Sequence, residues 1–283
     1  MAKAWIGISG WTFPGWRGTF YPEDLVQKKE LEYASRAVNS IEINGTFYAL
    51  QRPATFKKWH AEVPANFQFS IKAPQFITHV LRLKEVEEPL ANFFASGLLC
   101  LQEKMGPILW QFPPFVTLKD DRFEKFLELL PSDGKSAAKL AKKHGEKVEG
   151  RAHTTVQGNF PVRHAFEFRH KSFLNKDFLA ILKAHNVAFV FAHEGGAKAP
   201  YTEEPTADFI YARLHGEGKP YAKGYPDREI TQWAKKIKAW NEEKKDTFIY
   251  FSNEAKVYSP QGAMTLLKLL QNEKPAVARK KAA

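Results

Sequence analysis

The chain has 283 residues and a formal net charge of +11, with 44 % hydrophobic and 26 % charged residues. This composition is typical of a globular protein that buries a sizeable core. It excludes an internal disulfide, because Cys100 is the only cysteine, and no apolar run approaches the roughly 18 residues that a membrane helix needs. We expect a cytoplasmic protein without a signal peptide or membrane partner. The sequence predicts no oligomeric state.

Most of the positive charge lies in two segments. Residues 132–163 carry seven basic against three acidic side chains, and residues 274–283 carry four basic side chains and no acidic one. Such segments are usually solvated appendages of a domain. We therefore predict a single domain over residues 1–272 with a basic helical insertion at 132–163, followed by a basic flexible tail at 273–283.

Short β-rich runs recur along the chain with helical patterns between most of them. The runs cover residues 5–9, 40–44, 67–72, 107–112, 164–169, 187–192, 209–215 and 247–253. The segments between them show apolar side chains at helical spacing, as at Phe123, Phe126 and Leu127. This alternation predicts a parallel sheet. About eight such units favour a single (β/α)8 TIM-type barrel over an open doubly wound sheet.

The alternation is irregular in two places. Residues 136–160 are basic and alanine-rich, and they predict an extra exposed helix followed by a loop. Residues 193–208, between the sixth and seventh strands, show no helical pattern and predict a loop. We expect a barrel that is somewhat irregular around the sixth and seventh strands.

Polar side chains stand at the carboxyl ends of the predicted strands. Residues two apart on a strand share a face, and such pairs are Glu42 and Asn44, Ser70 and Lys72, Glu167 and Arg169, and Arg213 and His215, with Ser9, Gln111 and Asn253 at three further ends. In a barrel these ends meet at the mouth, where the chemistry is placed. Buried charges are costly unless paired. The pattern therefore predicts a polar ligand pocket or a ring of salt bridges that closes the barrel.

Three cations against two carboxylates favour an anionic, phosphate-bearing ligand, because guanidinium groups match phosphate and carboxylate geometry. In an enzyme, a glutamate would act as general acid or base while the cations stabilise developing negative charge. The catalytic candidates are Glu42, Glu167 and His215, and the ligand-binding candidates are Trp11, Trp16, Asn44, Lys72, Gln111, Arg169, Arg213 and Asn253.

An aromatic loop over residues 8–22 follows the first predicted strand and would lie at the same mouth. Its glycines and prolines set its bends. We expect Phe13, Phe20 and Tyr21 to pack on the first helix, and Trp11 and Trp16 to form a stacking wall for a base or a sugar.

No cofactor is predicted, because no Walker-type, Rossmann or nucleophile-elbow pattern occurs. The histidines show no metal-ligand spacing. A divalent metal held by His193, His215 and a carboxylate is the alternative, since barrel metal sites draw ligands from separate strands. Cys100 lies in an apolar helical setting and is expected to be an inert buried thiol.

Several motifs occur in an order that resembles a known family. They are Gly10-Trp11 with Pro14-Gly15-Trp16, Glu42 through Tyr48, Phe69 through Pro74, Phe166 through His170, and Arg213 through Gly216. Together they resemble the YecE-like proteins, also known as domain of unknown function 72, over residues 5–270. The resemblance implies a TIM barrel related in shape to xylose isomerase and endonuclease IV, and it implies no established activity.

The sequence departs from the family pattern at the last strand, where it has Phe251-Ser252-Asn253-Glu254, and after the sixth strand at residues 192–196. Three functions stay open. The first is an enzyme, such as a hydrolase or isomerase, that acts on a small anionic ligand. The second is a non-catalytic barrel that binds nucleic acid through residues 132–163 and the tail. The third is a carbohydrate hydrolase that uses Glu42 and Glu167.

Overall fold

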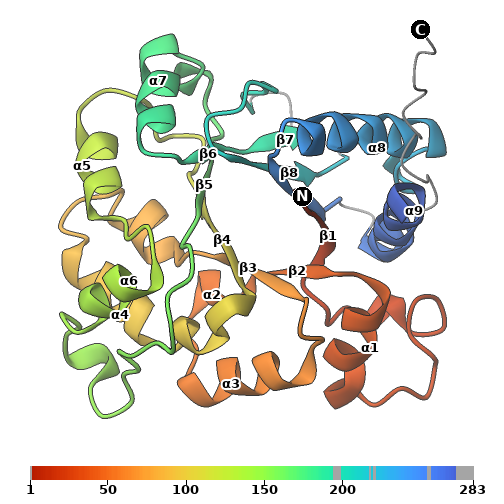
Figure 1. The fold of residues 1–283 in the computed structure, drawn as a ribbon, viewed down its shortest axis with the longest axis horizontal. Coiled ribbons are helices and arrows are strands. Elements are labelled where there is room, and N and C mark those ends of the chain that lie inside the picture. The colour runs from red at the N-terminus through yellow and green to blue at the C-terminus, as the bar shows by residue number, and fades with distance from the viewer. Residues whose placement is uncertain (1, 194–198, 217, 219–220, 254–255, 272–283) are drawn as a thin grey trace, which may run out of the picture.

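The computed structural model describes residues 2–193, 199–216, 218, 221–253 and 256–271. Its centre is a ring of parallel strands with helices around the outside (Figure 1). The strands are β1 (Ala4–Ser9), β2 (Ser40–Ile43), β3 (Gln68–Lys72), β4 (Met105–Gln111), β5 (His164–Glu167), β6 (Ala188–Phe189), β7 (Phe191–His193), β8 (Phe209–Leu214) and β9 (Asp246–Phe251). Every predicted strand is present, and the predicted α/β barrel is confirmed.

The helices lie between strands, as the alternation predicts, except for the last one, which follows β9. They are α1 (Glu30–Ala37), α2 (Gly45–Tyr48), α3 (Pro53–Glu62), α4 (Glu87–Ala95), α5 (Arg122–Leu129), α6 (Gly134–Ala141), α7 (Lys176–Ala184), α8 (Asp227–Glu242) and α9 (Ser259–Gln271). Helix α6 lies within the basic segment 132–163 and beside α4 (Figure 1). The predicted tail, 273–283, lies outside the described residues.

The ring closes through the backbone at one position. The sheet order is β6-β5-β4-β3-β2-β1-β9-β8-β7, so its two ends are consecutive segments of one stretch of chain. Val190 lies between them: its N–H donates to the carbonyl of Phe166 at 2.9 Å, and its own carbonyl accepts from Ala192 at 3.0 Å. The first segment pairs with β5 and the second with β8. The irregularity predicted near the sixth strand is therefore an interruption of that strand.

The barrel interior changes from apolar to charged along its axis. A cluster of buried apolar and aromatic side chains fills its lower part: Trp5, Leu109, Ala165, Ala188, Val190, Phe209, Tyr211, Phe248 and Tyr250. The two tyrosine hydroxyls pair with serines, Tyr211 with Ser70 at 2.6 Å and Tyr250 with Ser40 at 2.7 Å. Because side chains two apart share a face, the next inward position on β8 after Tyr211 is Arg213.

A second core, rich in aromatic residues, joins the strands to the helices outside them. Within it, Trp110 Nε1 donates to Nδ1 of His164 at 3.1 Å. The Nε2 of His164 therefore carries the proton and donates to the carbonyl of Pro131 at 2.8 Å. Burial lowers the pKa of His164 from 6.5 to about 4, so its imidazole is neutral and serves as a hydrogen-bonding link in the core.

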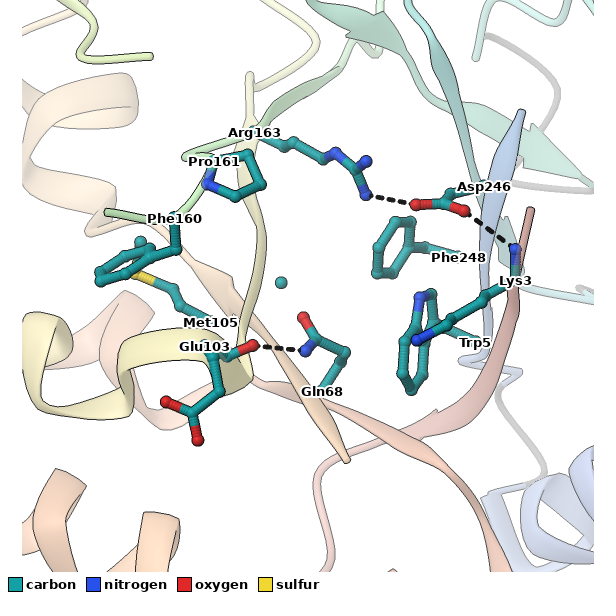
Figure 2. Close-up of a pocket in the computed structure, with 11 residues that line it drawn as sticks. Lys3, Trp5, Gln68, Glu103, Met105, Phe160, Pro161, Arg163, Asp246 and Phe248 are labelled. Carbon is teal, nitrogen blue, oxygen red and sulfur yellow. Dashed lines mark hydrogen bonds and ion pairs between the residues drawn. The ribbon is translucent and has the colours of Figure 1, made fainter. Parts of the chain in front are cut away.

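A cavity of about 280 Å³ lies at the amino end of the barrel (Figure 2). Arg163 pairs with Asp246 across it at 2.9 Å, and the backbone N–H of Lys3 donates to the same carboxylate at 2.9 Å. The amide of Gln68 donates to the carbonyl of Glu103 at 2.7 Å. These pairs hold the base of the barrel together. Chemistry in TIM barrels is found at the opposite end, so we assign this cavity a structural role.

Candidate functional site

Glu42 lies at the mouth, near the carboxyl end of β2, and its side chain is fully buried. Three donors hold its carboxylate. Ser9 Oγ donates to Oε1 at 3.0 Å, Tyr211 donates to Oε2 at 2.7 Å, and Arg213 Nη2 donates to Oε1 at 2.9 Å. The donors come from β1 and β8, so the carboxylate joins strands from separate parts of the ring.

Glu167 ends β5 and is also fully buried. Arg213 Nη1 donates to its Oε2 at 2.7 Å, so one guanidinium bridges the two glutamates. Its Oε1 lies 2.6 Å from Arg169 Nη2, accepts from Gln111 Nε2 at 3.1 Å, and lies 3.7 Å from His215 Nε2. We call Glu42, Glu167 and Arg213 the charged floor. The sequence predicts either a ligand pocket or a ring of salt bridges at this place, and the charged floor contains the ion pairs of such a ring.

The electrostatics of the floor favour a fixed, ionised arrangement. Burial by itself raises the pKa of Glu167, but Arg213 and Arg169 outweigh burial and hold that pKa well below its usual range. A buried carboxylate of low pKa with several partners is a weak proton acceptor. This argues against the predicted role of Glu167 as general acid or base.

Lys72 ends β3 and differs from the two arginines of the site. Its Nζ lies 4.0 Å from the centre of the Phe47 ring. Among the described residues, no carboxylate oxygen lies within ion-pair distance of this ammonium group. Burial first, and then the charge of Arg213, lower the pKa of Lys72 to about 8. Near neutral pH the side chain is therefore mostly a cation, and no counter-ion for it lies among the described residues.

His215 follows β8 and lies between opposite charges. Its Nε2 is 3.4 Å from Arg169 Nη2 and 3.7 Å from Glu167 Oε1. Burial lowers the pKa of His215 in spite of the carboxylate, so the imidazole is neutral near pH 7. The structure thus brings six predicted residues into contact with one another: Glu42, Gln111, Glu167, Arg169, Arg213 and His215.

Trp16 is a correction to the predicted site. It is only 2 % exposed, because the short helical turn Pro14–Trp16 directs it inward, where its ring packs on Phe13, Phe20 and Tyr21. It belongs to the core and offers no surface to a ligand. The expected packing on the first helix is confirmed for Phe20 and Tyr21, whose rings contact Tyr33 of α1, whereas the ring of Phe13 packs on Trp16.

Asn253 is placed apart from the charged floor. Its buried Oδ1 accepts a hydrogen bond from Ser259 at the start of α9, so it fixes that helix to the end of β9. The preceding residue, Ser252, takes the position beside the charged floor that the sequence predicts for Asn253. Its Oγ accepts from Arg213 Nη2 at 3.2 Å.

A cavity of about 360 Å³ adjoins the charged floor, and we call it the side cavity. It is lined by Ser9, Gly10, Trp11, Thr12, Ile43, Asn44, Gly45, Gln51 and Trp59. Trp11 and Asn44 were predicted for the site, whereas Gln51 and Trp59 were not. Trp59 lies on α3, where its apolar helical spacing predicts packing only. The Ser9 hydroxyl both lines the cavity and donates to Glu42.

The described parts of the chain offer neither a cluster of metal ligands nor a membrane-spanning helix. No group of three His, Cys, Asp or Glu side chains there could hold a metal ion. His193, one of the proposed ligands, instead lies 3.0 Å from the Tyr225 hydroxyl through its Nδ1. No helix within these residues is long and apolar enough to span a membrane.

Fold and site together define a TIM-type barrel with a charged mouth and a side cavity. The chain belongs to the family described as "Protein of unknown function DUF72", whose model matches residues 5–283. It is 24 % identical to the UPF0759 protein YunF of Bacillus subtilis, over 97 % of each chain. It is 27 % identical to the UPF0759 protein YecE of Escherichia coli K12, over 46 % of this chain and 45 % of that protein.

Solved structures of the same family share the fold. A DUF72 family protein of Thermotoga maritima superposes with a TM-score of 0.72 at 22 % identity, covering 95 % of this chain and 99 % of that one. One from Enterococcus faecalis gives a TM-score of 0.70 at 16 % identity, covering 96 % and 97 %. The predicted resemblance to the YecE-like family is confirmed.

Proposed function

We propose that the protein binds a small anionic, phosphate-bearing ligand at the mouth of the barrel, above the charged floor. The observation that carries this proposal is Lys72. Arg213 is held between Glu42 and Glu167, and Arg169 lies against Glu167, whereas Lys72 has no carboxylate within ion-pair distance among the described residues. Among the described residues of the mouth, the three cations Lys72, Arg169 and Arg213 and the two carboxylates leave one positive charge, which an anion would neutralise.

A buried N–H group of Arg213 also supports the binding of an anion. The Nε of Arg213 is buried and has no hydrogen-bond acceptor among the described residues. Leaving a buried donor unsatisfied costs about 1–3 kcal/mol. An oxygen of a bound phosphate would supply an acceptor for it.

The chemistry that this arrangement supports best is proton transfer on the bound ligand. A proton-transfer group works best when its pKa lies near the operating pH, and the pKa of Lys72 is about 8. We assign Lys72 the role of acid or base in an isomerisation or hydrolysis, with the glutamates as fixed charges below it. A glycosidase that uses Glu42 and Glu167 as its carboxylate pair has less support, because both side chains are fully buried and paired with Arg213.

The proposal is tested by calorimetric titration with inorganic phosphate and phosphate monoesters. We expect Lys72→Gln to weaken binding at least tenfold, since one charge pair at about 4 Å in a partly buried site interacts by roughly 4 kcal/mol. Affinity should also fall as the pH rises through about 8, where Lys72 loses its proton. Lys125→Gln, at an exposed lysine on α5, is the matched control and should bind as the unaltered protein does.

Two results would refute the anion site. One is the same affinity in the Lys72→Gln and Lys125→Gln proteins. The other is the absence of binding by any phosphate compound at millimolar concentration. If the protein turns over a phosphate compound, the Lys72→Gln protein should be inactive. An active Lys72→Gln protein would refute the role of Lys72 in proton transfer.

A specific observation favours nucleic-acid binding as a second candidate. The exposed ring of Phe115 lies 4.8 Å below the guanidinium of Arg82, and Lys147 lies 5.3 Å above the exposed ring of Phe76. Aromatic surfaces interleaved with cations are the means by which proteins bind single strands without sequence preference. Residues 76, 82 and 115 follow β3 and β4, on the side of the mouth.

This second candidate predicts affinity for a labelled single-stranded oligonucleotide that falls steeply with salt, because phosphate contacts release counterions. Deleting residues 274–283 and changing Lys139, Lys142 and Lys143 to Gln should remove most of that affinity. The three lysines are exposed on and after α6. Undetectable binding at low salt would exclude the candidate and leave the small-ligand proposal unaffected.

A further inference from the structure

We infer that the side cavity is a subsite for an uncharged sugar ring, so that the ligand at the mouth is a sugar phosphate. The inference rests on the proposed binding of a phosphate-bearing ligand, and it identifies the part of that ligand to which the phosphate is attached. The cavity is lined by two indole rings and by the hydroxyl and amide groups of Ser9, Thr12, Asn44 and Gln51.

The chemistry of the lining excludes a charged occupant. None of the described residues around the side cavity carries a charge, in contrast to the charged floor next to it. Hydroxyl and carboxamide groups both donate and accept hydrogen bonds, which matches the hydroxyl groups of a sugar. The volume of about 360 Å³ lies within the range of small-molecule pockets and holds one ring.

Asn44 supplies an acceptor that the protein does not use. Its Oδ1 is buried and has no hydrogen-bond partner among the described residues. Asn44 lies two residues beyond Glu42, directly before α2, and it lines the side cavity. Buried polar atoms in native proteins are almost always satisfied. A hydroxyl group of a bound sugar would donate to this oxygen.

The two tryptophans distinguish a sugar from a nucleobase. The rings of Trp11 and Trp59 lie edge to face, with centroids 5.2 Å apart and planes at 82°. The two rings are therefore nearly perpendicular, whereas a planar base inserted between two rings needs two parallel faces. The C–H face of a sugar packs on a single indole face. The ring of Phe56 packs on Trp59 with the ring centroids 5.1 Å apart, and the ring of Phe69 packs on Trp11 with the centroids 6.5 Å apart.

The position of the side cavity links the ring to the anion. Ser9 lines the cavity and donates to Glu42, which is bound by Arg213. A sugar ring in the side cavity would thus be separated from the charged floor by the side chain of Ser9. Its phosphate would extend toward Lys72 at the mouth.

Titration with matched phosphates tests the subsite. Glucose 6-phosphate, ribose 5-phosphate and glycerol 3-phosphate all carry a phosphate monoester, but glycerol 3-phosphate has no ring. We expect a sugar phosphate to bind at least tenfold more tightly than glycerol 3-phosphate. Trp59→Leu and Asn44→Ala should each remove that preference while the affinity for glycerol 3-phosphate stays unchanged. Trp5→Phe, in the cavity at the amino end, is the control for loss of a tryptophan and should keep the preference.

The possible outcomes separate the two proposals. Equal affinity for glycerol 3-phosphate and both sugar phosphates overturns the subsite and leaves the anion site intact. Tighter binding of adenosine monophosphate than of either sugar phosphate, lost in Trp59→Leu, overturns the sugar in favour of a nucleobase. If no phosphate binds, quenching of tryptophan fluorescence by free glucose in the unaltered protein but not in Trp59→Leu supports the subsite while the anion site fails. The absence of that quenching then overturns both.

Discussion

The guanidinium of Arg213 is the only described cation in contact with both buried glutamates, so replacing it tests the charged floor directly. Arg213→Met keeps much of the side-chain volume and removes the charge. Glu42 and Glu167 are both fully buried, and each would lose its ion pair with Arg213. Glu167 would keep its ion pair with Arg169. Among the described residues, Glu42 would keep the hydroxyl groups of Ser9 and Tyr211 as its hydrogen-bond donors.

The loss of stability follows from the burial of these carboxylates. Removing one partner of a buried ion pair costs about 3–5 kcal/mol, because a charge is left uncompensated away from water. At about 2 °C per kcal/mol for a chain of this size, the thermal midpoint should fall by about 6–10 °C. Thermal unfolding followed by circular dichroism measures the difference.

The loss of stability in Arg213→Met should depend on pH. In the unaltered protein the folded-state pKa of Glu167 is held well below 4.5, so its contribution to stability is present above pH 4.5 and is lost on further acidification. Without Arg213, burial favours the neutral acid. The Arg213→Met protein should therefore lose less stability relative to the unaltered protein at pH 5 than at pH 7.5.

A triple variant supplies the control. Glu42→Gln, Glu167→Gln and Arg213→Met together remove all three charges of the floor, and this protein should be more stable than Arg213→Met alone. A loss below about 1 kcal/mol in Arg213→Met, the range of an exposed ion pair, would refute the reasoning. An equal loss at pH 5 and pH 7.5 would refute it as well.

Two further predictions concern the scaffold. His164 has a pKa of about 4 when folded and 6.5 when unfolded, so the unfolding free energy should fall by up to about 3 kcal/mol between pH 6.5 and 4. Urea titrations should show a flatter profile over this range for His164→Asn, and an unchanged profile would contradict the assignment. Gly7→Ala should cost at least about 3 kcal/mol, because its Cβ would lie 2.0 Å from the Ser40 carbonyl oxygen. Gly45→Ala, with open space around it, should be neutral in the same denaturation assay, and equal losses in the two variants would count against the steric explanation.

The fold could be predicted because its signals are local. Each strand shows apolar residues of high β-propensity, and the helices between them show one apolar stripe. The mouth could be predicted as well, since the carboxyl ends of parallel strands must meet. Glu42, Glu167 and Arg213 were selected in this way, and their side chains do converge.

The rest of the site depends on contacts that sequence spacing does not encode. Trp11 and Trp16 occur in the same loop rich in glycine and proline, and only the turn at Pro14–Trp16 decides which of them is buried. Tyr211 reaches Glu42 across the barrel, a contact between residues 169 positions apart. The position of Trp59 beside Trp11 likewise depends on how α3 packs against the loop after β1.

The interruption at Val190 has a consequence for self-association. An open sheet offers its outermost strands as templates for strand addition, and this is a common route to aggregation. Here the two outermost strands, β6 and β7, have only two and three residues and are joined by a single residue. A foreign strand would find too few free backbone groups in register to pair with. The barrel is thereby protected against edge-to-edge aggregation without a complete ladder of hydrogen bonds at its seam.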